Sequence, residues 1–187
     1  LVDKGDFITS PIISILFSEM LSIWTVSFWQ NLKCPKNINL IELGAGNGQM
    51  MYDMINSFRN FPKFNKSCKF YILETSPYLK KIQKEKLKKF NVTWIKNLNE
   101  LKKKYNIFIA NEFFDALPIK QFFKNNKKWM ERFVVLQKNN KKKFIDFNYN
   151  IKKIEKKIGF KISKNQKIIE YSPLGLEYLK IISKIIN

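Results

Sequence analysis

Acidic residues and glycines stand together where the apolar run that begins at residue 38 ends. Glu42 stands one residue before the end of that run, and Gly44, Gly46 and Gly48 follow the run in a G-x-G-x-G pattern. Glycines after a strand let the backbone turn tightly and approach a ligand without a Cβ clash, and the next helix offers free amides. The pattern predicts a ligand-binding loop. An ordinary glycine-rich turn is the alternative.

A second acid, Glu74, closes the second predicted strand, residues 69–74 (KFYILE). In a doubly wound sheet the carboxyl ends of neighbouring strands face one crevice, so a carboxylate there can accept hydrogen bonds from both ribose hydroxyls of an adenosine cofactor. Its separation from the glycine turn, roughly thirty residues with one helix between, suits the next βα unit. The alternative is a solvent-exposed glutamate at a strand end.

A third polar group follows the apolar residues 107–110. Asn111, Glu112 and Asp115 interleave there with Phe113 and Phe114. If this strand lies beside the first one, its tip is across the topological switch point from the glycine loop. The polar groups would then line a transfer site, where carboxylates can orient a cationic nitrogen by charge-assisted hydrogen bonds. The phenylalanines would form a wall of that site. Alternatively, they belong to the core and Asp115 caps a helix.

Alternating strands and helices must position these groups. The apolar runs are continuous, which indicates a parallel sheet covered by helices on both faces, an α/β fold. Four strands are expected: one within residues 38–50 that runs into the glycine turn, and others at 69–74, 92–95 and 106–111. Helices are expected from the glycine turn to about residue 61, over residues 76–90, and as a short basic helix before residue 106.

The apolar residues 11–29 raise the question of a transmembrane helix. Glu19 and the stripe of Ser14, Ser18, Ser22 and Thr25 on one helical face favour instead a buried helix laid over the fold. Such a helix would begin with Ser10 as N-cap and Pro11 at its first position.

The last third of the chain changes character. Residues 130–137 and 144–149 predict a hairpin whose polar turn is solvated rather than a phosphate site. A basic segment, a short strand at residues 166–172 and a helix from Pro173 follow. We expect one domain over residues 1–187, divided into an N-terminal cap helix region (1–36), cofactor-binding βα units (37–128) and a hairpin with a C-terminal substrate-side segment (129–187).

Composition narrows the chemistry. The chain of 187 residues has a formal charge of +20 and no histidine, so the commonest general base and metal ligand is missing, and we expect no metal site. The spacing of the two cysteines, Cys34 and Cys68, matches no zinc site and indicates a reducing compartment. Arginine occurs only as Arg59 and Arg132, whereas nucleic-acid sites favour arginine, so we expect no nucleic-acid partner.

The glycine spacing resembles motif I of class I S-adenosylmethionine methyltransferases. A longer series of stretches, in order and approximate spacing, resembles the MidA-like family of these enzymes: GDFITSP (5–11), FSEM (17–20), IELGAGNGQMMYD (41–53), ETSPYLKKIQ (74–83), IANEFFDALPIKQF (109–122), WMERFV (129–134) and EYSP (170–173). The mitochondrial members of that family are the protein arginine methyltransferases of complex I assembly.

This resemblance implies a Rossmann-like methyltransferase fold, incomplete at both ends, with S-adenosyl-L-methionine as cofactor. Asp6, Thr9 and Ser10 would lie on the substrate side with Phe113 and Phe114. The implied acceptor is an arginine of the large NADH dehydrogenase subunit. The implied compartment is the bacterial cytoplasm or the mitochondrial matrix, without membrane insertion.

Alternative functions remain open. Ile12 and Ile15 stand where the family commonly has an acid and an amide, which motivates a second hypothesis, a non-catalytic relative that binds a partner during assembly. The positive charge leaves RNA methylation as a third hypothesis, to be tested by the salt dependence of RNA binding. A dinucleotide oxidoreductase is disfavoured because its fingerprint is G-x-G-x-x-G.

Overall fold

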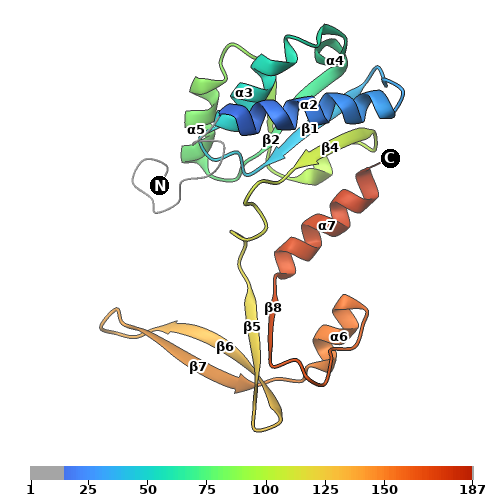
Figure 1. Ribbon diagram of the computed structural model, residues 1–187. Coiled ribbons are helices and arrows are strands. Elements are labelled where there is room, and N and C mark those ends of the chain that lie inside the picture. The colour runs from blue at the N-terminus through green and yellow to red at the C-terminus, as the bar shows by residue number, and fades with distance from the viewer. Residues whose placement is uncertain (1–14, 187) are drawn as a thin grey trace. The chain divides into compact units, whose positions relative to one another are not determined.

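The structure is a computed structural model that describes residues 15–186 (Figure 1). The expectations placed on Asp6, Thr9 and Ser10, and on the start of the first helix, lie outside the described residues. The chain forms two compact units. One comprises the described residues up to Ala116 together with those from Tyr178 onward, and the other is Leu117–Glu177.

The first unit contains a parallel sheet in the order β3-β2-β1-β4. Figure 1 labels β1, β2 and β4 of this sheet. The six residues of β1 are all buried, as expected for a strand between two others that is covered on both faces. Strand order reverses between β1 and β4, so the carboxyl ends of these two strands flank the position where such sheets bind ligands. The strands are β1 Ile38–Leu43, β2 Cys68–Leu73, β3 Val92–Ile95 and β4 Tyr105–Ile109.

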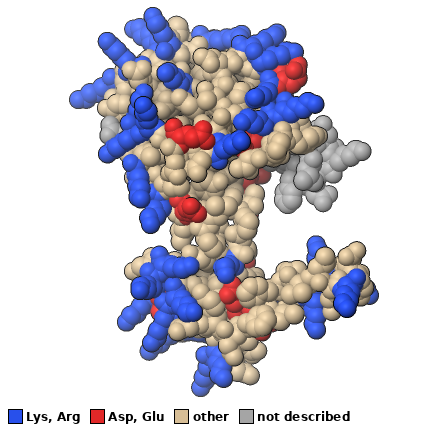
Figure 2. Space-filling model, turned by 180° about the vertical axis from the view of Figure 1, so that it is seen from behind, with Lys and Arg blue, Asp and Glu red and all other residues tan. Residues whose placement is uncertain are grey.

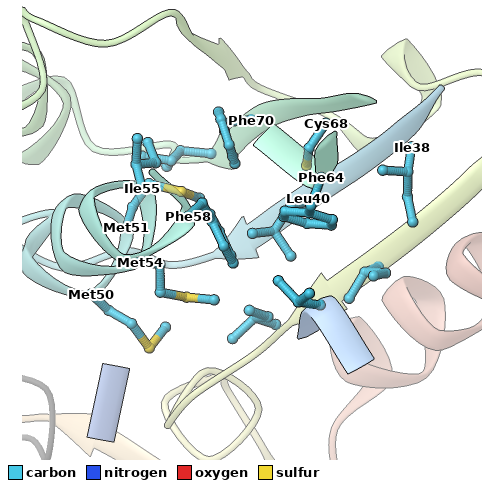
Figure 3. Close-up of a cluster of buried hydrophobic side chains, with 14 of the residues drawn as sticks. Ile38, Leu40, Met50, Met51, Met54, Ile55, Phe58, Phe64, Cys68 and Phe70 are labelled. Atoms are coloured by element: carbon cyan, nitrogen blue, oxygen red, sulfur yellow. The ribbon is translucent and has the colours of Figure 1, made fainter. Parts of the chain in front are cut away.

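Helices cover both faces of this sheet, which confirms the predicted α/β architecture. Figure 3 shows the cluster of buried hydrophobic side chains on one face, where α3 and α4 meet β1 and β2. In this cluster the centre of the Phe58 ring lies 4.7 Å from the centre of the Phe64 ring and 5.9 Å from the centre of the Phe70 ring. On the other face the residues of α7 from Tyr178 onward pack against a second cluster. The helices are α2 Ile15–Asn31, α3 Gln49–Phe58, α4 Pro62–Ser67, α5 Pro77–Lys86, the 3-10 helix η1 Leu98–Glu100, and α7 Pro173–Ile185.

The polar stripe of α2 is its buried side. Ser18, Ser22 and Thr25 have no exposed surface, and the small side chains allow α2 to pack closely against α3. The bulkier Met20 and Trp24 are more than half exposed. The prediction of a helix laid over the fold is confirmed, although only one of its faces is covered. In the described part of the chain, no helix is both long and apolar enough to cross a membrane.

Two asparagines connect the sheet to the end of α7. Asn39 Nδ2 of β1 donates to Asn106 Oδ1 of β4 at 2.7 Å, and Asn106 Nδ2 donates to the Ile185 carbonyl at 2.7 Å. Both asparagines are buried. Buried amides stabilise a fold when they are paired in this way, so the pair fixes the last turn of α7 on the sheet.

The second unit is an antiparallel sheet in the order β7-β6-β5-β8. The predicted hairpin, the short strand at residues 166–172 and the helix from Pro173 are confirmed, and the hairpin turn is exposed. The sequence did not predict β5, and α6 lies in the basic segment. The elements are β5 Lys120–Asn125, β6 Lys128–Leu136, β7 Lys142–Asn148, α6 Lys152–Ile158 and β8 Ile168–Tyr171.

Candidate functional site

The glycine turn between β1 and α3 adopts a backbone conformation that favours glycine. Gly44, Gly46 and Gly48 have φ angles of 69°, 53° and 80°. A Cβ on Gly48 would lie 3.3 Å from the Cγ atom of Gln83, whereas no atom lies within 4 Å of one on Gly46. The turn is therefore packed at Gly48 and open at Gly46, where a ligand can approach the backbone.

Glu42 lies next to this turn, near the carboxyl end of β1, and is a buried acid. Only 3% of its surface is exposed, and its Oε2 atom has no hydrogen-bond partner among the described residues. Burial raises the pKa of the carboxyl from 4.5 to about 8, and a backbone hydrogen bond from Met51, in the first turn of α3, opposes that rise. An unpaired buried carboxylate is costly, so a cation or donor beside Oε2 would be bound favourably.

Glu74 follows β2 and is held at both carboxylate oxygens. The Ser76 amide donates to Oε1 at 2.8 Å, and Gln83 Nε2 donates to Oε2 at 2.9 Å. Ser76 also caps α5 by accepting from the Leu79 amide at 3.3 Å, and Pro77 takes the first helical position. Glu74 is 7% exposed, so it is not the solvent-exposed strand end that was the alternative.

The loop after β4 carries the three polar residues expected at the transfer site. Asn111 is half-buried, while Glu112 and Asp115 are exposed. Within the described residues, their side chains make no hydrogen bond or ion pair, which leaves them available to an acceptor. Glu112 has a φ of 47°, an unfavourable backbone for a residue with a Cβ and one that occurs often at functional sites. The loop forms turns, so Asp115 does not cap a helix.

The two phenylalanines of this loop are half-buried and meet edge to face, with ring centres 5.4 Å apart. Phe113 also lies 5.2 Å from the Tyr178 ring and contacts the apolar cluster on that face of the sheet. A Cβ on Gly44 would come within 2.8 Å of the Phe113 ring. The loop after β4 and the glycine turn are therefore in direct contact, as strand order predicted.

Gln83 was not predicted from the sequence, although it connects three parts of the site. It has no exposed surface, and its side chain bonds to Gly46, Glu74 and Trp94. A glutamine in a lysine-rich helix looks like a solvent-facing residue. One signal in the sequence could have indicated that Gln83 is buried: it stands four residues before Leu87, so both lie on one helical face, and Leu87 is fully buried.

Basic side chains are scattered over the face of the molecule that Figure 2 shows. A cavity of about 550 Å³ lies at the opposite end of the strands, beside the start of β2 and β3, with Arg59, Lys69 and Lys89 in its lining. Ligand sites in parallel sheets lie at the carboxyl ends of strands. The candidate site is therefore the edge formed by Glu42, the glycine turn, Glu74 and the loop after β4.

The sequence of the chain is similar to those of proteins named as arginine methyltransferases. The chain is 34% identical over 153 residues to the mitochondrial protein arginine methyltransferase NDUFAF7 of Xenopus tropicalis, and 33% identical over 156 residues to that of Homo sapiens. These alignments cover 69% and 71% of this chain, but 36% and 35% of the relatives. The aligned part thus spans about a third of the length of these curated relatives.

A solved structure shares the fold. The chain superposes with a TM-score of 0.75 and 20% identity on a "likely methyl transferase" from Burkholderia thailandensis bound to S-adenosyl-homocysteine, covering 98% of this chain and 47% of that one. Residues 20–187 match the family model described as "Putative S-adenosyl-L-methionine-dependent methyltransferase". This match covers most of the chain and confirms the MidA-like resemblance. The chain belongs to this methyltransferase family.

Proposed function

We propose that the chain binds S-adenosyl-L-methionine and takes part in transferring its methyl group to an arginine side chain of a protein. One arrangement carries the proposal: two buried acids, Glu42 and Glu74, lie at the carboxyl ends of β1 and β2 on either side of a left-handed glycine turn. This arrangement lies at the switch point of a parallel sheet, where nucleotide-like ligands bind.

The polar groups present fit this cofactor. Each oxygen of Glu74 accepts one hydrogen bond within the protein, and a carboxylate has about four acceptor positions, so lone pairs remain for two ribose hydroxyls. The unpaired Oε2 of Glu42 suits the ammonium of the methionine end, directly or through a water molecule. The open backbone at Gly46 admits the ligand without a Cβ clash.

When bound, this cofactor supplies a methyl group activated by a sulfonium. The chain's own residues have to position the acceptor nitrogen in line with that group and to stabilise charge. Glu112 and Asp115 are exposed acids without partners among the described residues, and together with Asn111 they would hold a guanidinium by charge-assisted hydrogen bonds. Phe113 and Phe114 would bound the site on one side.

The arginine acceptor is supported by the relatives, whose names describe protein arginine methyltransferases of mitochondria. As in the resemblance above, the proposed partner is a subunit of NADH dehydrogenase (complex I), and the compartment is the mitochondrial matrix or the cytoplasm of a bacterium. Because the chain spans only part of these relatives, the catalytic activity itself is part of the proposal.

The first experiment is calorimetric titration with S-adenosylhomocysteine, comparing the chain with Glu74→Ala. We expect binding in the micromolar range, about 8 kcal/mol, and a loss of about 1 to 3 kcal/mol in the variant because a buried charged acceptor is removed. Glu170→Ala is the matched control, since Glu170 is an exposed acid in β8 of the second unit. Equal affinities of the chain and Glu74→Ala would contradict the ribose assignment.

A transfer assay then separates catalysis from binding. The chain is incubated with radiolabelled cofactor and the large NADH dehydrogenase subunit, and the label is located by mass spectrometry. Label on arginine supports the proposal. Cofactor binding without transfer, under conditions in which an intact relative is active, would favour the non-catalytic relative. Binding of RNA that weakens steeply with salt would favour RNA methylation.

A further inference from the structure

Gln83 is a buried side chain at which three segments of the candidate site meet. Its Nε2 atom donates to the Gly46 carbonyl and to Glu74 Oε2, both at 2.9 Å, and its Oε1 atom accepts from Trp94 Nε1 at 2.9 Å. These partners belong to the glycine turn, the residue after β2, and β3. One carboxamide therefore joins the loops that follow β1 and β2 to the third strand.

The chemistry of the partners fixes which way this carboxamide faces. The Trp94 indole can only donate, so it selects the oxygen of the carboxamide. The Gly46 carbonyl and the Glu74 carboxylate can only accept, so they select the nitrogen and use both of its protons. A reversed carboxamide would place acceptor against acceptor on one side and donor against donor on the other, at a side chain that has no exposed surface.

The same bonds fix the plane of the Glu74 carboxylate. Gln83 holds Oε2 from the second turn of α5, and the Ser76 amide holds Oε1 from the start of that helix. A carboxylate fixed at both oxygens presents its remaining lone pairs in set directions. Such a group recognises a pair of hydroxyls at lower entropic cost than a freely rotating one.

We propose that Gln83 is the positioning residue of ribose recognition, which orients Glu74 relative to the glycine turn so that the carboxylate reads the ribose diol. The inference rests on the proposed cofactor site. Beyond that site, it assigns a role to Gln83, which acts through Glu74. It also predicts a specificity that can be measured, the preference for a ribose over a 2′-deoxyribose. Trp94 supports this role by fixing the Gln83 carboxamide.

The test compares two ligands, S-adenosylhomocysteine and its 2′-deoxyribose analogue, by calorimetry on the chain and on Gln83→Met. The chain is expected to prefer the ribose form by about tenfold or more, the effect of one hydrogen bond to a charged group. Gln83→Met keeps the side-chain length but removes all three bonds, and the preference should fall below about threefold. A purely structural role of Gln83 would weaken both ligands equally and leave the preference unchanged.

Two further variants keep the test decisive if Gln83→Met does not fold. Trp94→Phe leaves Gln83 in place but removes the donor that orients it, and the ribose preference should fall in that variant as well. Gln83→Glu replaces the donor by an acceptor facing two acceptors, so its affinity for S-adenosylhomocysteine should rise as pH is lowered and the introduced carboxyl is protonated. Gln121→Met, at a half-buried strand position in the second unit, is the control and should retain the preference.

The outcomes separate the two proposals. If the folded chain binds neither ligand, the proposed function fails and this inference fails with it. If the chain binds both ligands but shows no ribose preference, or if Gln83→Met and Trp94→Phe keep the preference of the unaltered chain, the role of Gln83 is wrong and the cofactor site stands. A preference lost in both variants and kept in the control supports the role.

Discussion

Phe113, in the loop after β4, lies against Gly44, in the turn after β1, so closely that a Cβ on Gly44 would come within 2.8 Å of the ring. A side chain at position 44 would therefore fit only if the Phe113 ring moved. The glycine thus has two reasons to be there, its φ of 69° and the ring beside it. The turn expected to hold a cofactor and the loop expected to hold an acceptor are consequently not independent.

This contact predicts different results for two neighbouring glycines. Gly44→Ala should destabilise the fold by about 2 to 4 kcal/mol, because it combines backbone strain with a displaced ring. Gly46→Ala meets no atom within 4 Å and should cost only the strain, about 1 kcal/mol. Urea unfolding of both variants measures the difference.

Gly46→Ala, the variant with the smaller loss of stability, should have a clear effect on cofactor affinity. Gly46→Ala fills open space where a ligand is expected, so it should weaken S-adenosylhomocysteine binding well beyond its small effect on folding. If Gly44→Ala and Gly46→Ala destabilise the fold equally, the Phe113 ring moves aside at little cost and the packing argument is wrong. If Gly46→Ala binds normally, the ligand does not approach the turn there.

The buried acid Glu42 predicts a pH-dependent stability. Its pKa is raised to about 8, so between pH 4.5 and 8 the folded state holds a proton that the unfolded state has released. Stability therefore falls with rising pH across this window, by at most about 1.4 kcal/mol per pH unit, and levels off above pH 8. Glu42→Gln should lack this contribution and be the more stable protein at pH 8.5. Parallel pH profiles for the two proteins would show that Glu42 is ionised at neutral pH.

Proton release should accompany cofactor binding. At pH 7 the Glu42 carboxyl is mostly protonated, and an ammonium placed beside its Oε2 atom favours the ionised form. Titration with S-adenosylhomocysteine in two buffers of different ionisation enthalpy should show release of up to about one proton. Glu42→Gln should show no release, and an unchanged release in that variant would assign the proton to another group.

The acids of the loop after β4 should matter for transfer and not for folding. Glu112→Gln and Asp115→Asn remove charge at exposed positions and should change stability by less than about 0.5 kcal/mol. Methyl transfer should fall about tenfold or more in each, since a charge-assisted bond to the guanidinium is lost. S-adenosylhomocysteine affinity serves as the internal control and should not change. Loss of that affinity would place these acids at the cofactor instead.

Asn106 is expected to anchor the end of α7. Asn106→Leu would leave Asn39 Nδ2 and the Ile185 carbonyl without their partner, at a cost of about 2 to 4 kcal/mol. The last turn of α7 should then exchange its amide hydrogens faster, as mass spectrometry can detect. Asn99→Leu, on the exposed surface of η1, is the control.

The parallel sheet could be predicted because β1, β2 and β4 are apolar runs separated by helical stretches, and β3 coincides with the predicted residues 92–95. β5 was not predicted, because its sequence KQFFKN has only two apolar residues between polar ends. It forms a strand by pairing with β6 and β8, which the sequence pattern does not reveal. The site acids could be expected at strand ends because their position follows from sheet topology. Gln83 could not be assigned a role, because its three partners come from segments that only the folded chain brings together.

The end of α7 belongs to the first unit, although the whole of Leu117–Glu177 precedes it. One face of the parallel sheet is thus covered by a helical segment that follows the whole second unit in the chain. Such a connection carries a loop-closure entropy that grows with the logarithm of the intervening length, about 0.6 kcal/mol for each doubling. The second unit lowers this cost when it folds first, because its ordered strands shorten the free chain. We therefore expect refolding of the second unit to precede the docking of Ile181 and Ile182 on the sheet.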